Sequence, residues 1–243
     1  MRFVFFTIFL IGSTKSFSQV TNIVLKKILV NIDSTNILVD IEIIKSAVND
    51  IASNTIFYLS QKNDSSYKNL IENTNGVSTY NKVKIIFSFN KEIISTNKIE
   101  ALKNYLQNYI FDSLKKEQPS LFTKTHLFYG INDGAIIALN MALQQPDKIN
   151  KTALYFSDYA VSPAIANYLS KDYGKLKGKL FILTKNVENK IVVLDEMITE
   201  LALKSTAMFY RIEDFDDTLD IIYTQGYNWL LANGNNIILK QGY

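Results

Sequence analysis

The segment Gly130-Ile131-Asn132-Asp133-Gly134 is the part of the sequence whose residue types and spacing come closest to a chemical site. An apolar run enters it and another apolar run follows it at once, which predicts a strand, a sharp turn and a helix. Such a turn raises its central side chain above a sheet, and its two glycines avoid side-chain clashes. The start of the following helix favours negative charge that develops beside the central residue. The arrangement suits nucleophilic attack on a carbonyl, provided that the central residue is a nucleophile.

Asn132 occupies that central position, where the G-x-S-x-G pattern of a nucleophile elbow carries serine. A carboxamide is a poor nucleophile, and no neighbouring base can turn it into an alkoxide. Asparagine adopts left-handed backbone conformations more readily than most residues, so we expect Asn132 to fit the turn. Asp133 is an alternative nucleophile, but it lies one residue out of register with the centre and is not favoured.

Histidine chemistry is confined to one position, because His126 is the only histidine in the chain of 243 residues. It precedes Asn132 in the segment that enters the turn, and a strand of that length spans roughly 20 Å. We therefore expect His126 to be structural, at a strand end or a partly exposed position. The absence of cysteine excludes disulfides, thiolate metal sites and cysteine nucleophiles. Because a glycine-rich phosphate loop is also missing, we expect no cofactor and no metal.

The elements that must position the turn are predicted from apolar periodicity. The predicted strands are Ile23–Val30, Asn36–Ile44, Thr55–Leu59, Lys82–Phe89, Thr125–Tyr129, Thr152–Phe156, Lys179–Leu183 and Ala207–Ile212. The predicted helices are Ile99–Leu114, Ala135–Leu143, Ala164–Leu169, Val193–Leu203 and Leu219–Leu231. Since crossovers between parallel strands place helices on both faces of a sheet, this order predicts an α/β fold. We expect a three-layer α/β/α sandwich with a mostly parallel sheet and antiparallel N-terminal strands.

With this layout, the sequence from about Tyr105 to Leu231 resembles the esterase D-like, putative-esterase branch of the α/β-hydrolase superfamily. The resemblance rests on the turn, on the order of elements and on several short segments. Those segments are Leu143–Lys148, Ala153–Ser157, Ser162-Pro163, Lys179–Thr184 and Tyr227–Leu231. The resemblance implies that residues 19–243 form one α/β-hydrolase-like domain, in which active relatives would use a Ser-His-acid triad.

The resemblance also implies a degenerate triad at Asn132, Glu188 and Asp217. Glu188 follows the seventh predicted strand, where the family places its acid. The family's histidine would lie between the last strand and the last helix, but residues 213–218 contain none, and Asp216 or Asp217 is the nearest counterpart. Asp217 also fits the start of a helix as an N-cap, which we favour as its role. The turn after the third predicted strand lacks the family's glycine.

The N-terminus predicts an exported protein. Arg2, the apolar run Phe3–Ile11 and the small residues after it have the layout of a secretory signal peptide covering residues 1–18. That run is too short to span a bilayer, so we expect no stable membrane insertion after cleavage and a periplasmic or secreted protein. Loss of Arg2 and Lys15 would lower the formal net charge from +3 to +1. Arg211 would then be the only arginine, which argues against binding nucleic acid.

These observations lead to three hypotheses for the function. We favour a catalytically inactive, esterase-like pseudo-hydrolase that binds a small-molecule ester, a peptide or a protein partner. The first alternative is an active carboxylic-ester hydrolase with a relocated nucleophile, such as Ser60 or Ser157, acting with Glu188 or Asp217. The second alternative is a structural or assembly protein of the cell envelope, for which the fold is a rigid body.

Overall fold

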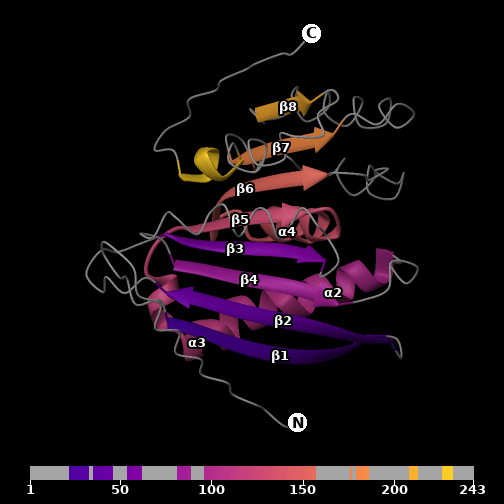
Figure 1. The fold of residues 1–243 in the computed structure, drawn as a ribbon, viewed down its shortest axis with the longest axis vertical. Coiled ribbons are helices and arrows are strands. Elements are labelled where there is room, and N and C mark those ends of the chain that lie inside the picture. Colours follow the sequence, from indigo (N-terminus) through magenta and orange to yellow (C-terminus); the bar gives the residue numbers. More distant parts are fainter. Residues whose placement is uncertain are drawn as a thin grey trace, which may run out of the picture.

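The computed structural model describes residues 22–32, 35–45, 54–61, 81–88, 96–156, 176, 179–185, 208–212 and 226–231. An eight-stranded sheet runs through these residues (Figure 1). The strands are β1 (Asn22–Ile32), β2 (Thr35–Lys45), β3 (Thr55–Gln61), β4 (Asn81–Ser88), β5 (His126–Ile131), β6 (Ile149–Phe156), β7 (Leu180–Lys185) and β8 (Met208–Ile212). Each predicted strand is therefore present, with its ends shifted by a few residues.

The order of strands across the sheet is β1-β2-β4-β3-β5-β6-β7-β8. β2 pairs antiparallel with both β1 and β4. All the remaining neighbours, from β4 and β3 to β7 and β8, pair in parallel. The predicted sheet, mostly parallel with antiparallel N-terminal strands, is confirmed.

Two helices, α2 (Thr96–Asn108) and α4 (Asp133–Gln144), cover one face of the sheet. Ten consecutive residues of α4 are buried, so this helix lies in the core instead of presenting a polar side to solvent. The opposite face carries the helix at residues 226–231, whose Tyr227 and Leu230 join a second apolar cluster on the sheet. The predicted three-layer sandwich is thus confirmed for the part of the chain that the structure describes.

One predicted helix is interrupted. The segment 99–114 was expected to be a single helix, but α2 ends at Asn108 and the chain continues as a π-helical turn, η2 (Tyr109–Leu114). Tyr109, Ile110 and Phe111 are consecutive and all buried. The wider π turn changes the direction in which successive side chains point, which lets neighbouring residues share the core. The short helices α3 (Lys115–Glu117) and η3 (Pro119–Phe122) then lead to β5.

Of the other predicted helices, one is partly described by the structure and two lie outside the described residues. Residues 226–231 form the end of the predicted helix Leu219–Leu231. The predicted helices 164–169 and 193–203 lie outside the described residues, as does the predicted signal peptide 1–18. Among the residues that are described, no helix combines the length and the apolar character needed to cross a bilayer.

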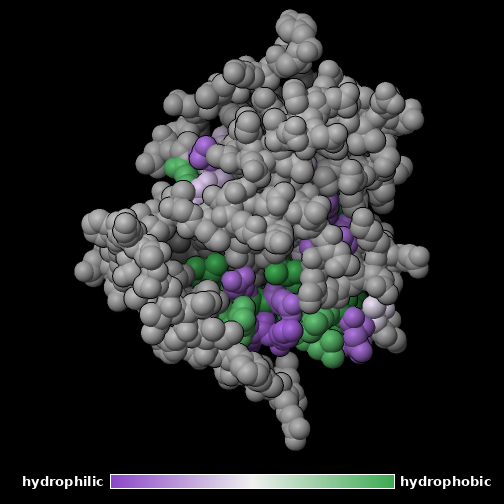
Figure 2. Space-filling view, viewed as in Figure 1, coloured by the Kyte–Doolittle hydropathy of each residue, from purple (hydrophilic) through white to green (hydrophobic). Residues whose placement is uncertain are grey.

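The surface over β1 and β2 mixes apolar and charged side chains, as the lower part of Figure 2 shows. Leu25 and Leu29, on the outermost strand β1, are 40% and 59% exposed. The alternate residues of the same strand, among them Ile28 and Val30, are buried against α2 and its neighbours. This alternation is the period-two pattern of a strand with one covered face, which is the pattern that a sequence can show for such a strand.

Candidate functional site

The predicted strand, turn and helix form a sharp elbow between β5 and α4. Asn132, at its apex, is the only non-glycine residue with a positive φ among those described, with φ 50° and ψ −114°. Its N–H donates to the carbonyl of Tyr155 over 2.8 Å, which ties the end of β5 to β6. Its own carbonyl accepts the N–H of Ala135 at 2.9 Å and so begins α4. Asn132 is partly exposed whereas Asp133 beside it is buried, so the elbow presents its central residue.

The backbone of Asn132 is not left-handed helical, because that conformation requires ψ near +47°. A positive φ with a strongly negative ψ is a conformation that only glycine adopts readily. The expectation that Asn132 occupies a turn with a strained, positive-φ backbone is confirmed, although its ψ lies outside the left-handed helical region. The elbow imposes strain on any side chain at this position, and the bonds to β6 and α4 hold it there.

Replacing Asn132 with glycine is expected to raise the free energy of unfolding by about 1 kcal/mol. The substitution removes strain of roughly 1–3 kcal/mol and adds a chain-entropy cost of roughly 0.5–1 kcal/mol. Denaturant unfolding can be followed through the fluorescence of Trp229, the single tryptophan. Asn132→Ala is the control, since it keeps the strain and should be no more stable than the wild type. A glycine variant less stable than the wild type would contradict the assignment of strain.

Gly130 and Gly134 are required because backbone segments meet closely on both sides of the elbow. A Cβ atom on Gly134 would lie 2.0 Å from the carbonyl oxygen of Leu59 in β3. A Cβ atom on Gly130 would lie 2.4 Å from the Cα of Ala135 in α4. Both distances are far below van der Waals contact, so the two glycines let the start of α4 pack directly on β3 and β5.

Asp133 is held by a residue that the sequence did not single out. Asp133 is 1% exposed, and its carboxylate accepts a hydrogen bond from Nε2 of Gln61, the last residue of β3. The carboxylate is thus directed toward β3 and away from the exposed apex, which agrees with the rejection of Asp133 as a displaced nucleophile. Gln61 could have been noticed as a polar residue at the end of an apolar strand, but nothing local in the sequence links it to Asp133.

Ser60, a candidate for a relocated nucleophile, is fully buried, and its hydroxyl donates to the carbonyl of Gln61 at 3.3 Å. Within the described residues this hydroxyl forms no hydrogen bond with a carboxylate. Ser157, Glu188 and Asp217 lie outside the described residues, so the acid and base positions of the degenerate triad stay predictions. In the same described set, no group of His, Cys, Asp and Glu could hold a metal ion.

His126 begins β5, whereas Asn132 follows the end of that strand, so the two lie at opposite ends of the sheet. Its Nδ1 donates to the carbonyl of Lys148 at 3.0 Å, and its backbone N–H donates to Oδ1 of Asn150 at 3.3 Å. The expected place at a strand end with partial exposure is confirmed. Burial lowers the pKa of His126, the charge of Lys115 lowers it further, and the hydrogen bond to Lys148 opposes both effects.

Comparison with known proteins gives matches in structure alone. No protein-family model and no curated protein sequence matches the chain. A dienelactone hydrolase from Anabaena variabilis has a TM-score of 0.59 at 10% identity, covering 86% of this chain and 97% of that one. An esterase from Pyrococcus furiosus has a TM-score of 0.56 at 13% identity, with coverage of 85% and 91%. A siderophore hydrolase from Aspergillus nidulans has a TM-score of 0.55 at 12% identity, with coverage of 89% and 95%. The structural matches establish a common fold, and because the identities are this low they establish the fold alone.

Proposed function

We propose that this chain, which has the α/β-hydrolase fold, has lost ester hydrolysis and acts by binding a ligand or a partner. The fold is the one shared by the dienelactone hydrolase and the esterases. The observation that carries the proposal is Asn132 at the apex of a fully formed elbow. A carboxamide there can accept and donate hydrogen bonds but cannot form an acyl-enzyme intermediate.

The missing base supports the same proposal. A triad needs a histidine within hydrogen-bond reach of the nucleophile, about 2.6–3.2 Å, to take its proton. The only histidine of the chain, His126, begins the strand that ends at the elbow and is held there by Lys148. Loss of a triad serine or histidine lowers kcat by roughly a million-fold in a comparable enzyme, so two such losses leave little turnover to expect.

The ligand that we propose is a carboxylic ester, or an ester-like group of a peptide or a protein partner. This choice is supported by the names of the structural neighbours, which are a dienelactone hydrolase, an esterase and a siderophore hydrolase. A partly exposed amide above buried neighbours could hold the carbonyl of such a ligand without attacking it. We further propose that residues 19–243 act outside the cytoplasm after removal of the signal peptide 1–18.

The test is an assay of the purified chain with short-chain aryl esters and a serine-reactive fluorophosphonate probe. We expect neither turnover above that of the heat-denatured chain nor covalent labelling. Asn132→Ser should also stay inactive, because a serine without a base remains protonated. Turnover that disappears in Asn132→Ala would contradict the proposal, and turnover that disappears in Ser60→Ala would establish the relocated-nucleophile alternative.

Binding is measured separately with intact esters. A ligand that binds the folded chain alone raises its melting temperature, by an amount that grows with ligand concentration. We expect such a rise for at least one class of aryl or alkyl ester, with the ester recovered unhydrolysed. If none of the aryl and alkyl esters tested changes the melting temperature, binding of esters is contradicted, whatever the result of the turnover assay.

A further inference from the structure

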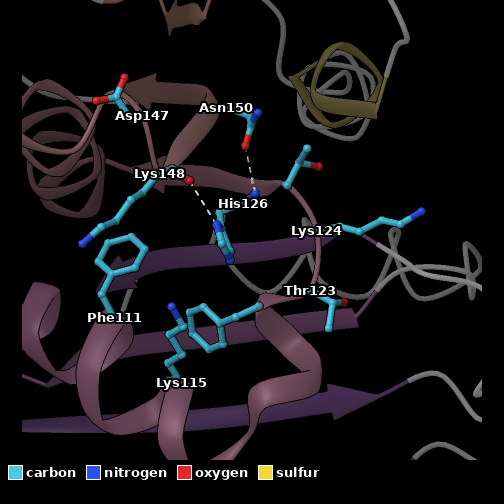
Figure 3. Close-up of a pocket in the computed structure, with 10 residues that line it drawn as sticks. Phe111, Lys115, Thr123, Lys124, His126, Asp147, Lys148 and Asn150 are labelled. Carbon is cyan, nitrogen blue, oxygen red and sulfur yellow. Dashed lines mark hydrogen bonds between the residues drawn. The ribbon is translucent and has the colours of Figure 1, made fainter.

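A cavity of about 440 Å³ opens at the amino ends of β5 and β6, at the other end of the sheet from Asn132. Its lining residues come from η2, α3, η3, the approach to β5 and the turn before β6, as Figure 3 shows around His126. Pockets for small molecules generally measure about 300–1,000 Å³. The cavity is therefore large enough for a small organic ligand, and the elbow takes no part in it.

The charged residues that line this cavity are mostly basic. Lys115, Lys124 and Lys148 contribute ammonium groups, and Asp147 contributes the one carboxylate. Lys148 also places its ammonium nitrogen 5.0 Å from the centre of the Phe111 ring. Because the excess charge of the lining is positive and part of the wall is apolar, the cavity favours an anion over a cation.

The apolar part of the lining is aromatic. The ring of Phe122 lies 5.1 Å from the imidazole of His126, and the ring of Phe111 meets it edge-on at 6.0 Å. These rings come from η3 and η2, respectively. Aromatic side chains in such offset and edge-on arrangements also favour a flat apolar ligand. The lining thus combines cations with a surface for an aromatic body.

His126 connects the two parts of the lining. Its Nδ1 donates to the Lys148 carbonyl, so in the neutral ring Nε2 carries the lone pair. That Nε2 is buried and has no hydrogen-bond partner among the described residues. The charged residues that line the same cavity are Lys115 from α3, Lys124 before β5, and Asp147 and Lys148 before β6. The side chains of Lys124 and Asp147 are directed away from the imidazole, as Figure 3 shows. An anion among these lysines would offset their charge and favour protonation of the ring.

We propose that this cavity binds a small arylcarboxylate anion, with its carboxylate among the lysines and its ring against Phe111 and Phe122. The proposal concerns a second site and does not depend on the function proposed for the elbow. Since His126 is the only histidine, its imidazole resonances report on this cavity without ambiguity in a chain purified without a histidine tag.

The experiment is an NMR titration of the His126 resonances with benzoate, against sodium chloride at equal ionic strength. We expect a saturable shift with benzoate and a higher pKa of His126 in its presence. Lys115→Ala and Lys148→Ala should each weaken binding by about five-fold, the effect of one partly exposed ion pair. Lys116→Ala is the matched control, because Lys116 is exposed on the same short helix and does not line the cavity.

The outcomes separate the two parts of the proposal. Absence of a saturable shift, or equal weakening by Lys116→Ala, would overturn the site. Equal affinity for benzyl alcohol would show that the charge is not used, and equal affinity for inorganic phosphate would show that the aromatic body is not used. Either result would overturn the assignment to an arylcarboxylate. All three lysines are exposed, so the variants are expected to fold, which circular dichroism can verify.

Discussion

Gly134→Ala is expected to lower the free energy of unfolding by about 3 kcal/mol or more, at the upper end of the cost of overpacking a core. The added methyl group would lie 2.0 Å from the carbonyl oxygen and 2.4 Å from the carbonyl carbon of Leu59. Both are backbone atoms of a strand paired on each side, so neither can move aside as a flexible side chain would. Relief would require α4 to withdraw from β3, although the helix is buried along most of its length.

Denaturant unfolding followed by Trp229 fluorescence measures this effect. Gly226→Ala is the matched control, because its added methyl group would meet the ring of Tyr129, with 2.8 Å as the shortest distance. A side-chain ring can adjust where a paired backbone cannot, so the control should lose clearly less stability than Gly134→Ala. A Gly134→Ala variant as stable as the wild type would contradict the close packing of α4 on β3.

Phe57→Ala is expected to lower the free energy of unfolding by about 3–5 kcal/mol, the usual cost of removing a fully buried aromatic ring. Phe57 has no exposed surface and stacks on Phe128 of the neighbouring strand at 4.9 Å. Phe122 and His126 also approach its ring, at 5.9 and 6.0 Å. The substitution therefore leaves a cavity bordered by several rings, which paired strands cannot close by collapsing.

The same unfolding measurement applies, with Phe57→Leu as the conservative control. Leucine fills much of the space and should cost less than half as much as alanine. Equal losses for the two variants would contradict a cavity as the cause. Since the ring of Phe57 also supports His126 from the side of β3, the alanine variant should broaden or shift the His126 resonances as well.

The sequence was most informative where the relevant contacts are local. The elbow could be predicted because its glycines, its apex and both flanking apolar runs are adjacent in the chain, from Gly130 to Gly134. The strands β1 and β2 could be predicted because the residues of β1 alternate between a buried and an exposed face and β2 continues the same apolar pattern. In both cases the structure follows from residues that are close together in the sequence, so the sequence pattern is enough to predict it.

Non-local contacts could not be predicted in this way. The hydrogen bond from Gln61 to Asp133 joins the end of β3 to the start of α4, and these two positions are far apart in sequence. The backbone angles of Asn132 depend on the bond to Tyr155 in β6 and not on the intrinsic preference of asparagine. The cavity around His126 collects residues from η2, α3, η3 and the turn before β6, and none of these segments is distinctive alone. The positions Glu188 and Asp217 rest on the resemblance to a family.

The place of β3 in the sheet has a consequence for synthesis of the chain. Both of its partners, β4 and β5, come later in the sequence, and every residue of β3 is buried in the folded protein. A ribosome adds about 5–20 residues per second, so this apolar segment waits for several seconds before β5 emerges. Both of its edges are unpaired until β4 emerges, and the edge that pairs with β5 stays open to other chains for the rest of that interval. Among the described strands we therefore expect β3 to be the main segment that holdase chaperones bind and that initiates aggregation when they are scarce.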